Sequence, residues 1–573
     1  MELLQMLSNG LAMLAKYWVA LLVFFLTTFG LGLFVARGLK LDKFQAGLGQ
    51  LACLPLGSLV LVIYAYLLAL LGYRWPFLLR PGGFLLVLLA ILALVRYAWE
   101  RRKGFRPDPL SIAVLTGLFL LLLVRLSFLA HLLVPPYSDS PLHYQALVDI
   151  LGQGNGANMK ISLGNIQNYY YHFGFHAATA WLVTVSGLPP LDAIALMGQF
   201  FLLIGPLAIF ALALSLTGSV PGALLAGLLA GVGWSMPAFA ANWGKYPALA
   251  ALSCAPAALA GLLAWPRRGL DWLRAILLLA LFLATVLLHT RIVFILGLAI
   301  VVFILVQKLV PENKPGIYQV LLRSLALGLF LWAFLTFFGE AYAVLPIWLF
   351  LLALTPFGAC HSPRLLLITL LFIAGIWLQT FLPLPRGQTL LDRPFIEILL
   401  AAPLSLWAGI GFAGLLDWLG DKRQAKAALS LAAVSLILAV FLSRGAYLPD
   451  PCCNYFTHQD DQAFGWIRQN VTSHTLFIIA VFADEKQRFG ADAGIWIESL
   501  TGAASNMFAY DTDWDDPASL ELLCHAGAGE TYLYAGGRDF SFPSAVLARQ
   551  VWLQPVFRAG QVQIYQVTGC PQP

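Results

Sequence analysis

The sequence predicts an α-helical membrane protein of many spans that ends in a small α/β domain. Apolar stretches of the length needed to cross a hydrocarbon core, about 20 residues, recur over most of the 573 residues. Only 11% of the residues are charged and the mean hydropathy is +0.81, whereas about a quarter of the residues in soluble domains are charged. After Arg444 the composition becomes more polar and strand patterns appear. We therefore predict a mainly α membrane domain over 1–444 and an α/β domain over 445–573.

Fourteen membrane spans are predicted from the apolar stretches. They lie near residues 12–36, 46–72, 82–99, 110–134, 191–216, 222–240, 246–265, 272–288, 292–308, 321–338, 343–358, 364–382, 395–418 and 427–443. The first stretch is too long for a signal peptide and lacks a small-residue cleavage pattern, so we interpret it as a retained span. One further apolar segment, 172–186, is short, and it either crosses the membrane or lies in the interface.

The basic residues decide between these alternatives. If 172–186 does not cross, the basic-rich loops all fall on one side, which the positive-inside rule assigns to the cytoplasm. These loops hold Arg37, Lys40 and Lys43; Arg96 to Arg106; Arg267, Arg268 and Arg274; Lys308, Lys314 and Arg323; Arg364; and Lys422, Arg423 and Lys426. The outer side then receives the N-terminus, a loop over 135–190 with membrane-lying helices, and the chain after about residue 444. The net charge of +6 therefore reflects membrane topology and does not indicate nucleic-acid binding.

The part after residue 444 has the pattern of a small α/β domain. An amphipathic helix is predicted over 460–470, a helix over 517–527, and strands over 475–482, 531–537 and 562–567. Four of the seven cysteines fall in this part, namely Cys452, Cys453, Cys524 and Cys570. Disulfides form in oxidising compartments, so an extracytoplasmic domain allows one or two of them, and the sequence leaves their pairing open.

Asp139 and His143 are the candidate catalytic residues. Ser140 suits the N-cap and Pro141 the first position of a helix that we predict from Pro141 to about Leu151. This helix carries His143 in its first turn, directly after Asp139. Asp139 could simply complement the helix dipole. We favour a functional role, because ionisable groups near membrane depth are costly and this one lies in an aromatic, proline-bounded loop.

The candidate substrate-binding residues are two histidines and the cations of the outer loops. His172 and His176 are four residues apart and share one face if that segment is helical. Both a place in an interfacial tyrosine belt and a substrate contact fit them. Four basic residues fall in outer loops together with one tyrosine, namely Lys245, Tyr246, Arg291, Arg386 and Arg393. Snorkelling to lipid headgroups explains any single cation, but together they suit a phosphate or pyrophosphate.

These segments resemble a known superfamily. "SDSPLHYQALVDIL" followed by "YYYHFGFHAATAWLVTVSGLPPLDAIAL" resembles the first outer loop of multi-spanning GT-C-type glycosyltransferases, and "NWGKYPALAAL" is similar to an aromatic–Gly–basic–Tyr turn of the same group. The tail, with "AFGWIRQNV", "ADAGIWIESLTG" and "VQIYQV", resembles the outer C-terminal domain of these proteins. The resemblance spans most of 130–260 and 455–567. It implies a GT-C-like membrane domain that transfers a sugar from a polyprenyl-phosphate donor, with Asp139 as the catalytic acid/base.

The resemblance also implies partners and a mechanism. The partners are a lipid-linked sugar donor, membrane lipid, and an extracytoplasmic glycan, lipid or protein acceptor. Asp139 accepts the proton of the attacking hydroxyl or orients that hydroxyl. The departing phosphate is neutralised by Lys245, Arg291, Arg386 or Arg393, and the donor is positioned by His143, His172 or His176. This sequence has Ser-Asp-Ser where metal-dependent members carry paired acids, so it departs from the pattern that requires a divalent metal.

Two alternatives remain open on the sequence. In the first, Asp139, His143, His172 and His176 supply the oxygen and nitrogen ligands of a zinc or manganese ion in a metal-dependent membrane enzyme. In the second, the protein is a transporter or lipid flippase. Against the second, the polar residues gather on one face of the membrane, and no pair of broken spans lies near the midplane.

Overall fold

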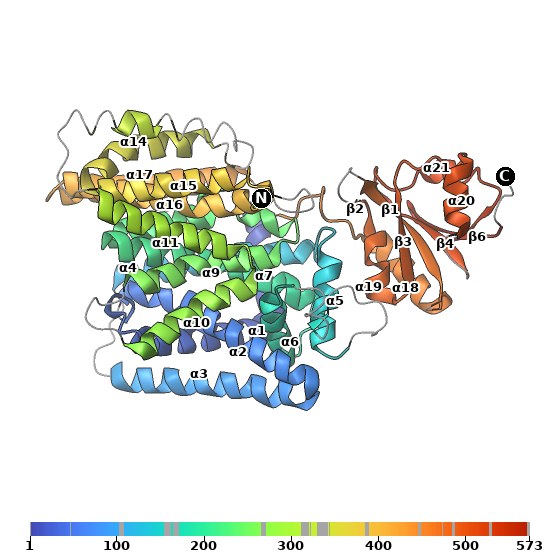
Figure 1. The fold of residues 1–573 in the computed structure, drawn as a ribbon, viewed down its shortest axis with the longest axis horizontal. Helices are drawn as coiled ribbons and strands as arrows, with labels where there is room; N and C mark the ends of the chain where they lie inside the picture. Colours follow the sequence, from blue (N-terminus) through green and yellow to red (C-terminus); the bar gives the residue numbers. More distant parts are fainter. Residues whose placement is uncertain are drawn as a thin grey trace.

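The structure is a computed structural model with two parts, a helical bundle and a sheet domain beside one end of it (Figure 1). It describes residues 2–45, 47–101, 108–153, 162–163, 171–264, 271–310, 320, 323–328, 330, 342, 344–383, 389–444, 448–472, 474–483, 488–525 and 530–569. The last helix of the bundle ends at Arg444, and the first helix of the sheet domain begins at His458. The boundary between the two parts therefore lies between Arg444 and His458.

The described part of the bundle is built of apolar helices. They are α1 (Glu2–Gly38), α2 (Cys53–Arg74), α3 (Leu79–Arg101), α4 (Pro109–Ser127), α5 (Ser140–Ile150), α6 (Gly174–Ser186), α7 (Pro190–Thr217), α8 (Val220–Leu228), α9 (Tyr246–Leu263), α10 (Trp272–Leu288), α11 (Ile292–Leu309), α14 (Leu345–His361), α15 (Pro363–Gln379), α16 (Arg393–Trp418) and α17 (Arg423–Arg444). Among the described residues, nine helices are long and apolar enough to cross a membrane, namely α1, α2, α3, α4, α7, α9, α11, α16 and α17. The chain is therefore an α-helical membrane protein.

The predicted spans and the observed helices can be compared one by one. Four further predicted spans appear as shorter apolar helices, at Val220–Gly233, Trp272–Leu288, Leu345–His361 and Pro363–Gln379. The remaining predicted span, 321–338, lies largely outside the described residues. Span 222–240 is shorter than predicted, because α8 passes into a π-helical turn at Leu229–Gly233 and the chain then leaves the helix. Two glycines in this turn weaken helical continuation.

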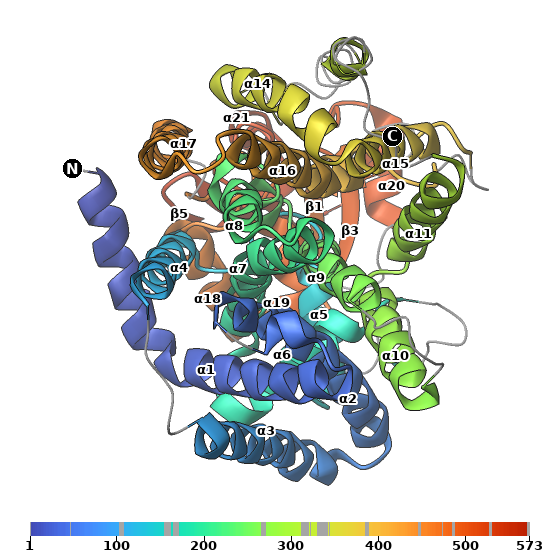
Figure 2. The ribbon, with the colours of Figure 1, turned by 90° about the vertical axis from the view of Figure 1, so that its left-hand side faces the viewer.

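The bundle has central and peripheral helices. Helices α7, α9 and α16 have 83–89% of their most apolar stretch buried, whereas the corresponding value for α3 is 17%. Seen along the bundle, α7, α9 and α16 lie inside, and α3, α14 and α17 lie at the rim (Figure 2). Leu88 and Leu92 of α3 are about half exposed. Apolar side chains on an outer face are what contact with lipid requires.

Helix contacts inside the bundle depend on small residues. A Cβ atom added to Gly57 of α2 would lie 1.7 Å from the Thr28 carbonyl oxygen of α1, and one added to Gly32 would lie 1.8 Å from the Cys53 carbonyl oxygen. Between apolar helices in lipid, such close backbone approach replaces the hydrophobic driving force that acts in water. Arg125 of α4 is buried at this depth, and its guanidinium donates to the Gly231 carbonyl in the π-helical turn at 2.7 Å. This carbonyl is a partner that the sequence could not identify.

Helices α5 and α6 are arranged differently from the long helices. Both run across the direction of the bundle at the end that faces the sheet domain (Figure 1). Lys16 of α1 pairs with Asp192 at the start of α7 at 3.0 Å, and Asn9 of α1 contacts His131 after α4 at 3.2 Å. The segment between α4 and α7 therefore begins and ends at the same end of the bundle, the geometry expected if 172–186 does not cross.

The sheet domain begins with α18 and contains one mixed sheet. Its elements are α18 (His458–Asn470), β1 (Leu476–Ala483), β2 (Arg488–Gly490), α19 (Ile497–Thr501), β3 (Ala504–Ala509), α20 (Pro517–His525), β4 (Thr531–Ala535), α21 (Ser544–Leu547), β5 (Leu553–Ala559) and β6 (Val562–Val567). The predicted helices and strands of this part are all present. The strand order is β2-β1-β4-β6-β5, with β3 parallel to β1.

Local sequence explains the start of this domain. Thr457 and Asp460 form a capping box at α18, which satisfies backbone N–H groups of the first turn. Trp496 and Tyr534 are fully buried in one core cluster, and the second cluster contains Trp514. Cys452 and Cys453 form a disulfide with each other, and Cys524 is also disulfide-bonded, whereas Cys570 lies outside the described residues.

Candidate active site

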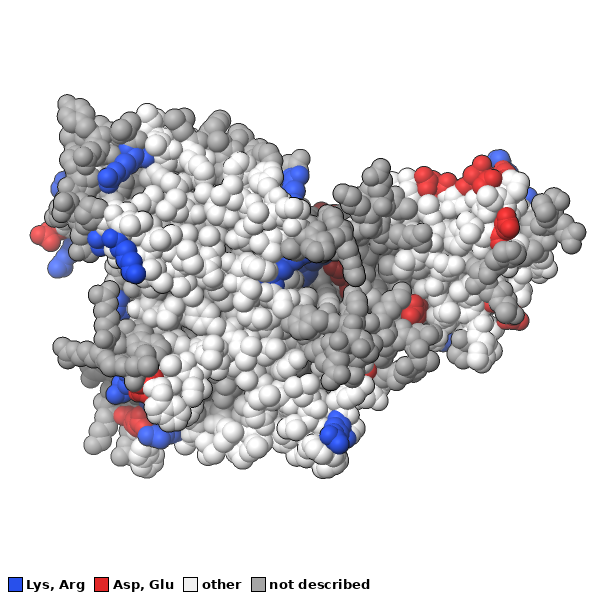
Figure 3. All heavy atoms as spheres, viewed as in Figure 1, with Lys and Arg blue, Asp and Glu red and all other residues white. Residues whose placement is uncertain are grey.

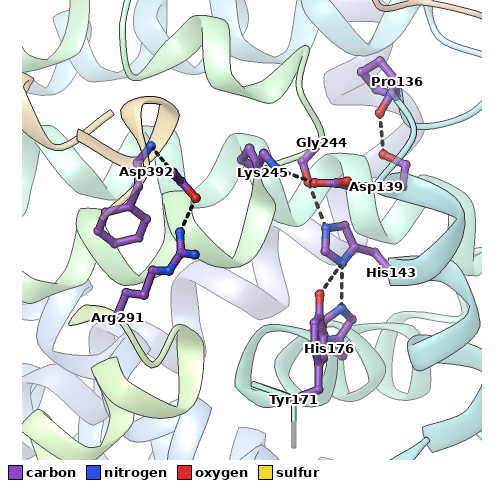
Figure 4. Close-up of polar contacts among 11 residues, drawn as sticks. Pro136, Asp139, His143, Tyr171, His176, Gly244, Lys245, Arg291 and Asp392 are labelled. Carbon is purple, nitrogen blue, oxygen red and sulfur yellow. Dashed lines mark hydrogen bonds and ion pairs between the residues drawn. The ribbon is translucent and has the colours of Figure 1, made fainter. Parts of the chain in front are cut away.

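One cavity of about 310 Å³ collects most of the predicted site residues. Its lining includes Asp139, His143, His172, Lys245 and Arg291, which come from four separate regions of the chain. Figure 4 shows how Asp139, His143, Lys245 and Arg291 lie, and Figure 3 shows basic and acidic atoms together in the hollow between the bundle and the sheet domain. The structure therefore places the predicted acid/base residue and two of the predicted cations around one space.

Asp139 occupies the N-cap position of α5 but does not cap the helix. Its backbone is helical, with φ −78° and ψ −23°, and its side chain makes no capping hydrogen bond. One carboxylate oxygen instead accepts from the Lys245 ammonium at 2.6 Å. The prediction of Ser140 as the N-cap was wrong by one residue, because the Ser140 hydroxyl turns back to donate to the Pro136 carbonyl at 2.5 Å. Asp139 therefore faces the cavity rather than the helix dipole.

The turn that carries Lys245 depends on Gly244. This glycine has φ +61°, a left-handed conformation that favours glycine, and a Cβ there would lie 2.8 Å from the Ser140 hydroxyl oxygen. The close approach brings the Lys245 ammonium to Asp139. Burial alone lowers the pKa of Lys245, but the Asp139 carboxylate outweighs this effect and the pKa is raised. Lys245 is therefore a fixed positive charge at neutral pH.

His143 is held as a neutral imidazole. Burial lowers the pKa of His143 to about 4. Its Nε2 lies 2.9 Å from the Gly244 carbonyl oxygen. A carbonyl only accepts, so the single proton of the neutral ring belongs on Nε2 and Nδ1 is an acceptor. The His176 Nε2 and the Tyr171 hydroxyl lie 3.1 and 3.3 Å from this Nδ1. His143 thus fixes the carbonyl next to Lys245 and presents no positive charge.

The other predicted residues of this region separate into two groups. His172 lines the cavity, with its ring 4.3 Å from the ring of His289. Burial, followed by its charged and histidine neighbours, lowers the pKa of His172 far below its usual range. His176 and Tyr246 are fully buried and are not among the residues that line the cavity. Both lie behind His143. They therefore support the side chains that line the cavity and do not face the cavity themselves.

Arg291 and Asp392 form the second ion pair of the cavity. Asp392 is the N-cap of α16, and its other carboxylate oxygen accepts from the Phe395 backbone N–H at 2.9 Å. Arg393 is the next residue, yet its guanidinium contacts Glu397 of the same helix at 2.7 Å and its side chain is 59% exposed. Arg393 is not among the residues that line the cavity. Arg386, also predicted to bind substrate, lies outside the described residues.

Among the titratable residues that line the cavity, sequence reasoning missed three, namely Tyr171, His289 and Asp392. Asp392 carried a usable signal, because an acid two residues before a proline at the start of an apolar span indicates an N-cap. His289 is the C-cap of α10 and directly precedes Thr290 and Arg291, and burial lowers its pKa to about 3. The histidines are thus neutral, and the charges in the cavity lining are those of Lys245, Arg291, Asp139 and Asp392.

The alternative metal site finds no geometric support. Among the described residues, no group of three or more His, Cys, Asp or Glu side chains is arranged to hold a metal ion. All four proposed ligands are described. Both ring nitrogens of His143 contact protein groups, and Asp139 is engaged with Lys245.

The fold and the cavity define a class, an α-helical membrane protein with a charge-paired polar cavity at one end of its bundle. Within that class the chain belongs to DUF6541, a family of unknown function, whose model matches residues 25–382. The matched range contains Asp139, Lys245 and Arg291 and ends before Asp392. No curated protein and no solved structure shows significant similarity to the chain.

Proposed function

We propose that the protein is a GT-C-like membrane glycosyltransferase that moves a sugar from a polyprenyl-phosphate donor to an extracytoplasmic acceptor. The observation that carries the proposal is a carboxylate free of its helix cap, Asp139, that shares one cavity with two cations, Lys245 and Arg291. An acid/base group and phosphate-binding groups are the two requirements of this reaction, and here they lie together although they are distant in sequence.

The distribution of basic residues supports an extracytoplasmic cavity within a topology of about fourteen spans. On the face drawn in Figure 3, most Lys and Arg atoms gather at the end of the bundle remote from the sheet domain. Arg37 in the last turn of α1 and Arg364 in the first turn of α15 belong to loops that the positive-inside rule assigns to the cytoplasm. The disulfides of the 448–569 region fit an oxidising compartment. The sheet domain and the cavity then both lie outside.

The cavity chemistry fits a direct transfer. An acceptor hydroxyl attacks the anomeric carbon of the sugar, Asp139 takes the hydroxyl proton, and a new C–O bond forms. The bond between the anomeric carbon and the phosphate oxygen breaks, and its electron pair leaves with the lipid phosphate. Arg291 contacts Asp392 through one terminal nitrogen, which leaves further donors of its planar fork for the phosphate. The Lys245 ammonium likewise has three donors and one described carboxylate partner.

The size and the neutral side chains of the cavity also fit a lipid-linked sugar. A volume of about 310 Å³ is near the lower end for small-molecule sites, enough for one sugar and its phosphate with the lipid tail outside. His172 and His289, kept neutral by burial, can exchange hydrogen bonds with sugar hydroxyls without adding charge. In this arrangement the neutral histidines bind the sugar, and the two cations beside them bind the phosphate.

The direct test is transfer by the purified protein. Labelled polyprenyl-phosphate sugars are incubated with the wild type, with Asp139→Asn, and with Asp421→Asn, an exposed acid between α16 and α17 as a matched control. We expect the wild type and the control to release lipid phosphate and to transfer label, and Asp139→Asn to lose this activity while remaining folded. Turnover by Asp139→Asn at the wild-type rate would remove Asp139 from its role. Absence of transfer from every donor by the wild type would contradict the function itself.

A further inference from the structure

The residue two positions before Asp139 has a strained backbone. Tyr137 has φ +71°, and among the described non-glycine residues only Lys40 shares a positive φ. For a residue with a Cβ, this conformation is unfavourable and persists only where its surroundings hold it. The Tyr137 backbone N–H donates to the Cys453 carbonyl at 2.9 Å, and the rings of Tyr137 and Tyr455 lie 6.0 Å apart. The segment leading into the sheet domain therefore holds the strained turn.

The same segment also contacts the turn that carries Lys245. The Asp450 backbone N–H donates to the side-chain oxygen of Asn242 at 2.8 Å. Asn242 is 1% exposed and lies three residues before Lys245. A short stretch, 450–455, thus joins the two turns whose side chains form the Lys245–Asp139 pair.

A second contact reaches α5 from the body of the sheet domain. The Ser499 hydroxyl of α19 donates to the Pro141 carbonyl at 3.3 Å and accepts from the Gln145 side-chain amide at 3.0 Å. Beside it, the rings of Tyr144 and Trp496 are 6.2 Å apart in an edge-on arrangement. Trp496 is fully buried in the domain core, so α5 rests on a rigid surface.

Arg538 joins the 450–455 stretch to the sheet domain. Its guanidinium donates to the Cys452 carbonyl at 2.9 Å and lies over the Tyr455 ring, 4.7 Å from the ring centroid. Arg538 follows β4 in the sheet. Its contacts therefore attach the 450–455 stretch to the sheet, so that this stretch is more than a linker between the two parts. The contacts from the sheet domain thus converge on the beginning of α5 and on the turn before α9.

We propose that the sheet domain is a positioning element of the cavity, in which Ser499, Arg538 and the 450–455 stretch hold the turns of Asp139 and Lys245 in the geometry of their ion pair. None of these groups lines the cavity, so they act through Asp139 and Lys245 and not on a ligand. The positioning itself does not depend on the reaction, whereas its effect on turnover rests on the proposed function. A domain that only captured the acceptor would have no need of contacts that converge on these two turns.

The first test measures positioning without any substrate. Amide hydrogen exchange of the full-length protein is followed in the peptide covering the start of α5, for Ser499→Ala and Arg538→Met. Matched controls are Ser519→Ala, which removes a part-exposed hydroxyl whose described partner is Asp516, and Arg549→Met, which removes an exposed arginine of the same domain. Because each variant removes one or two hydrogen bonds, we expect exchange at α5 to rise on the order of tenfold in Ser499→Ala and Arg538→Met and to stay unchanged in the controls.

Rescue and kinetics complete the test. Ser499→Thr retains a hydroxyl and should return exchange toward the wild-type rate. In transfer assays, Ser499→Ala should lower kcat about tenfold with little change in the donor KM, because the acid/base group is misplaced while the phosphate site stays. Unchanged exchange at α5 in both Ser499→Ala and Arg538→Met would overturn the proposal. A change confined to the acceptor KM would overturn it as well, since it indicates an acceptor-binding domain. If the wild type transfers no sugar, the proposed function fails, and the exchange results still decide the positioning role.

Discussion

Two aspartates of this protein stand in the same local sequence and make different contacts. Asp139 precedes Ser-Pro at the start of α5, and Asp392 precedes Arg-Pro at the start of α16. Asp392 has extended backbone, with ψ 159°, and caps its helix through the Phe395 N–H. Asp139 has ψ −23° and caps nothing. An Asp-x-Pro pattern therefore specifies a helix start but does not specify where the carboxylate points.

The difference comes from the neighbouring turns. Asp392 uses one oxygen for the cap and the other for Arg291, so both its oxygens have partners. Asp139 follows the strained Tyr137 by two residues and points toward the Lys245 ammonium, and only this one side-chain partner is described for it. A carboxylate with an available oxygen can take a proton, whereas one committed to a helix cap and an arginine holds structure. On this comparison we propose a chemical role for Asp139 and a supporting role for Asp392.

The largest expected effect separates these two roles. Asp139→Asn should lower turnover by about 10²- to 10⁴-fold, the range expected for loss of a general base. Asp392→Asn keeps a side-chain oxygen for the cap and should lower turnover less than tenfold, through a less firmly held Arg291. Single-turnover release of lipid phosphate measures both. Equal losses in the two variants would refute the division of roles.

A second prediction concerns the histidines of the cavity. The comparison of Asp139 with Asp392 assumes that these histidines are neutral and that only the two ion pairs carry charge there. Burial lowers the pKa of His143 to about 4 in the folded protein, from 6.5 for an exposed histidine. Between these values the unfolded chain binds more protons, so stability rises with pH through this window and is lost as pH falls from 6.5 toward 4. This shift corresponds to on the order of 3 kcal/mol.

The measurement is the unfolding midpoint in detergent from pH 7.5 to 4.5. His143→Gln should show a shallower loss on acidification than the wild type, and His474→Gln, at an exposed position of the sheet domain, should follow the wild type. A wild-type midpoint that is independent of pH would show that His143 is not held neutral by burial.

The outcome of the sequence reasoning can be explained residue by residue. The helices were predictable, because apolar stretches of membrane length and prolines at helix starts are local signals, as at α7 and α16. The pairing of Asp139 with Lys245 was not predictable, because 106 residues separate them and only the packing of α5 against the turn before α9 joins them. Arg393 was predicted to bind substrate on its outer-loop position, yet Glu397 one helical turn on takes its guanidinium. Loop position alone does not determine where a long side chain points.

A third prediction isolates the helix cap. Replacing Asp392 by alanine should cost about 1 kcal/mol more unfolding free energy than replacing it by asparagine, because only asparagine keeps the capping oxygen. At position 139 the alanine and asparagine variants should have equal stability, since no cap exists there. Thermal unfolding of the four variants gives both differences. A stability difference at 139 as large as that at 392 would show that Asp139 caps α5 after all.

The smallest expected effect is that of Arg393→Met. Its guanidinium pairs with the buried Glu397 carboxylate, one helical turn away, and does not line the cavity. Turnover and donor KM should each change less than twofold, whereas Arg291→Met should raise the donor KM tenfold or more. A comparable rise in KM for Arg393→Met would place this residue in the phosphate site.

The measurement that tests the central claim most directly is photocrosslinking of a polyprenyl-phosphate analogue with a photoreactive group next to its phosphate. The full-length protein in lipid nanodiscs is labelled and digested, and the modified peptides are identified by mass spectrometry. We predict label in the peptides containing Lys245, Arg291 and Phe395, reduced in Arg291→Met and unaffected in Arg393→Met. Label confined to other parts of the bundle, or equal label in Arg291→Met and the wild type, would show that this cavity does not receive the lipid phosphate.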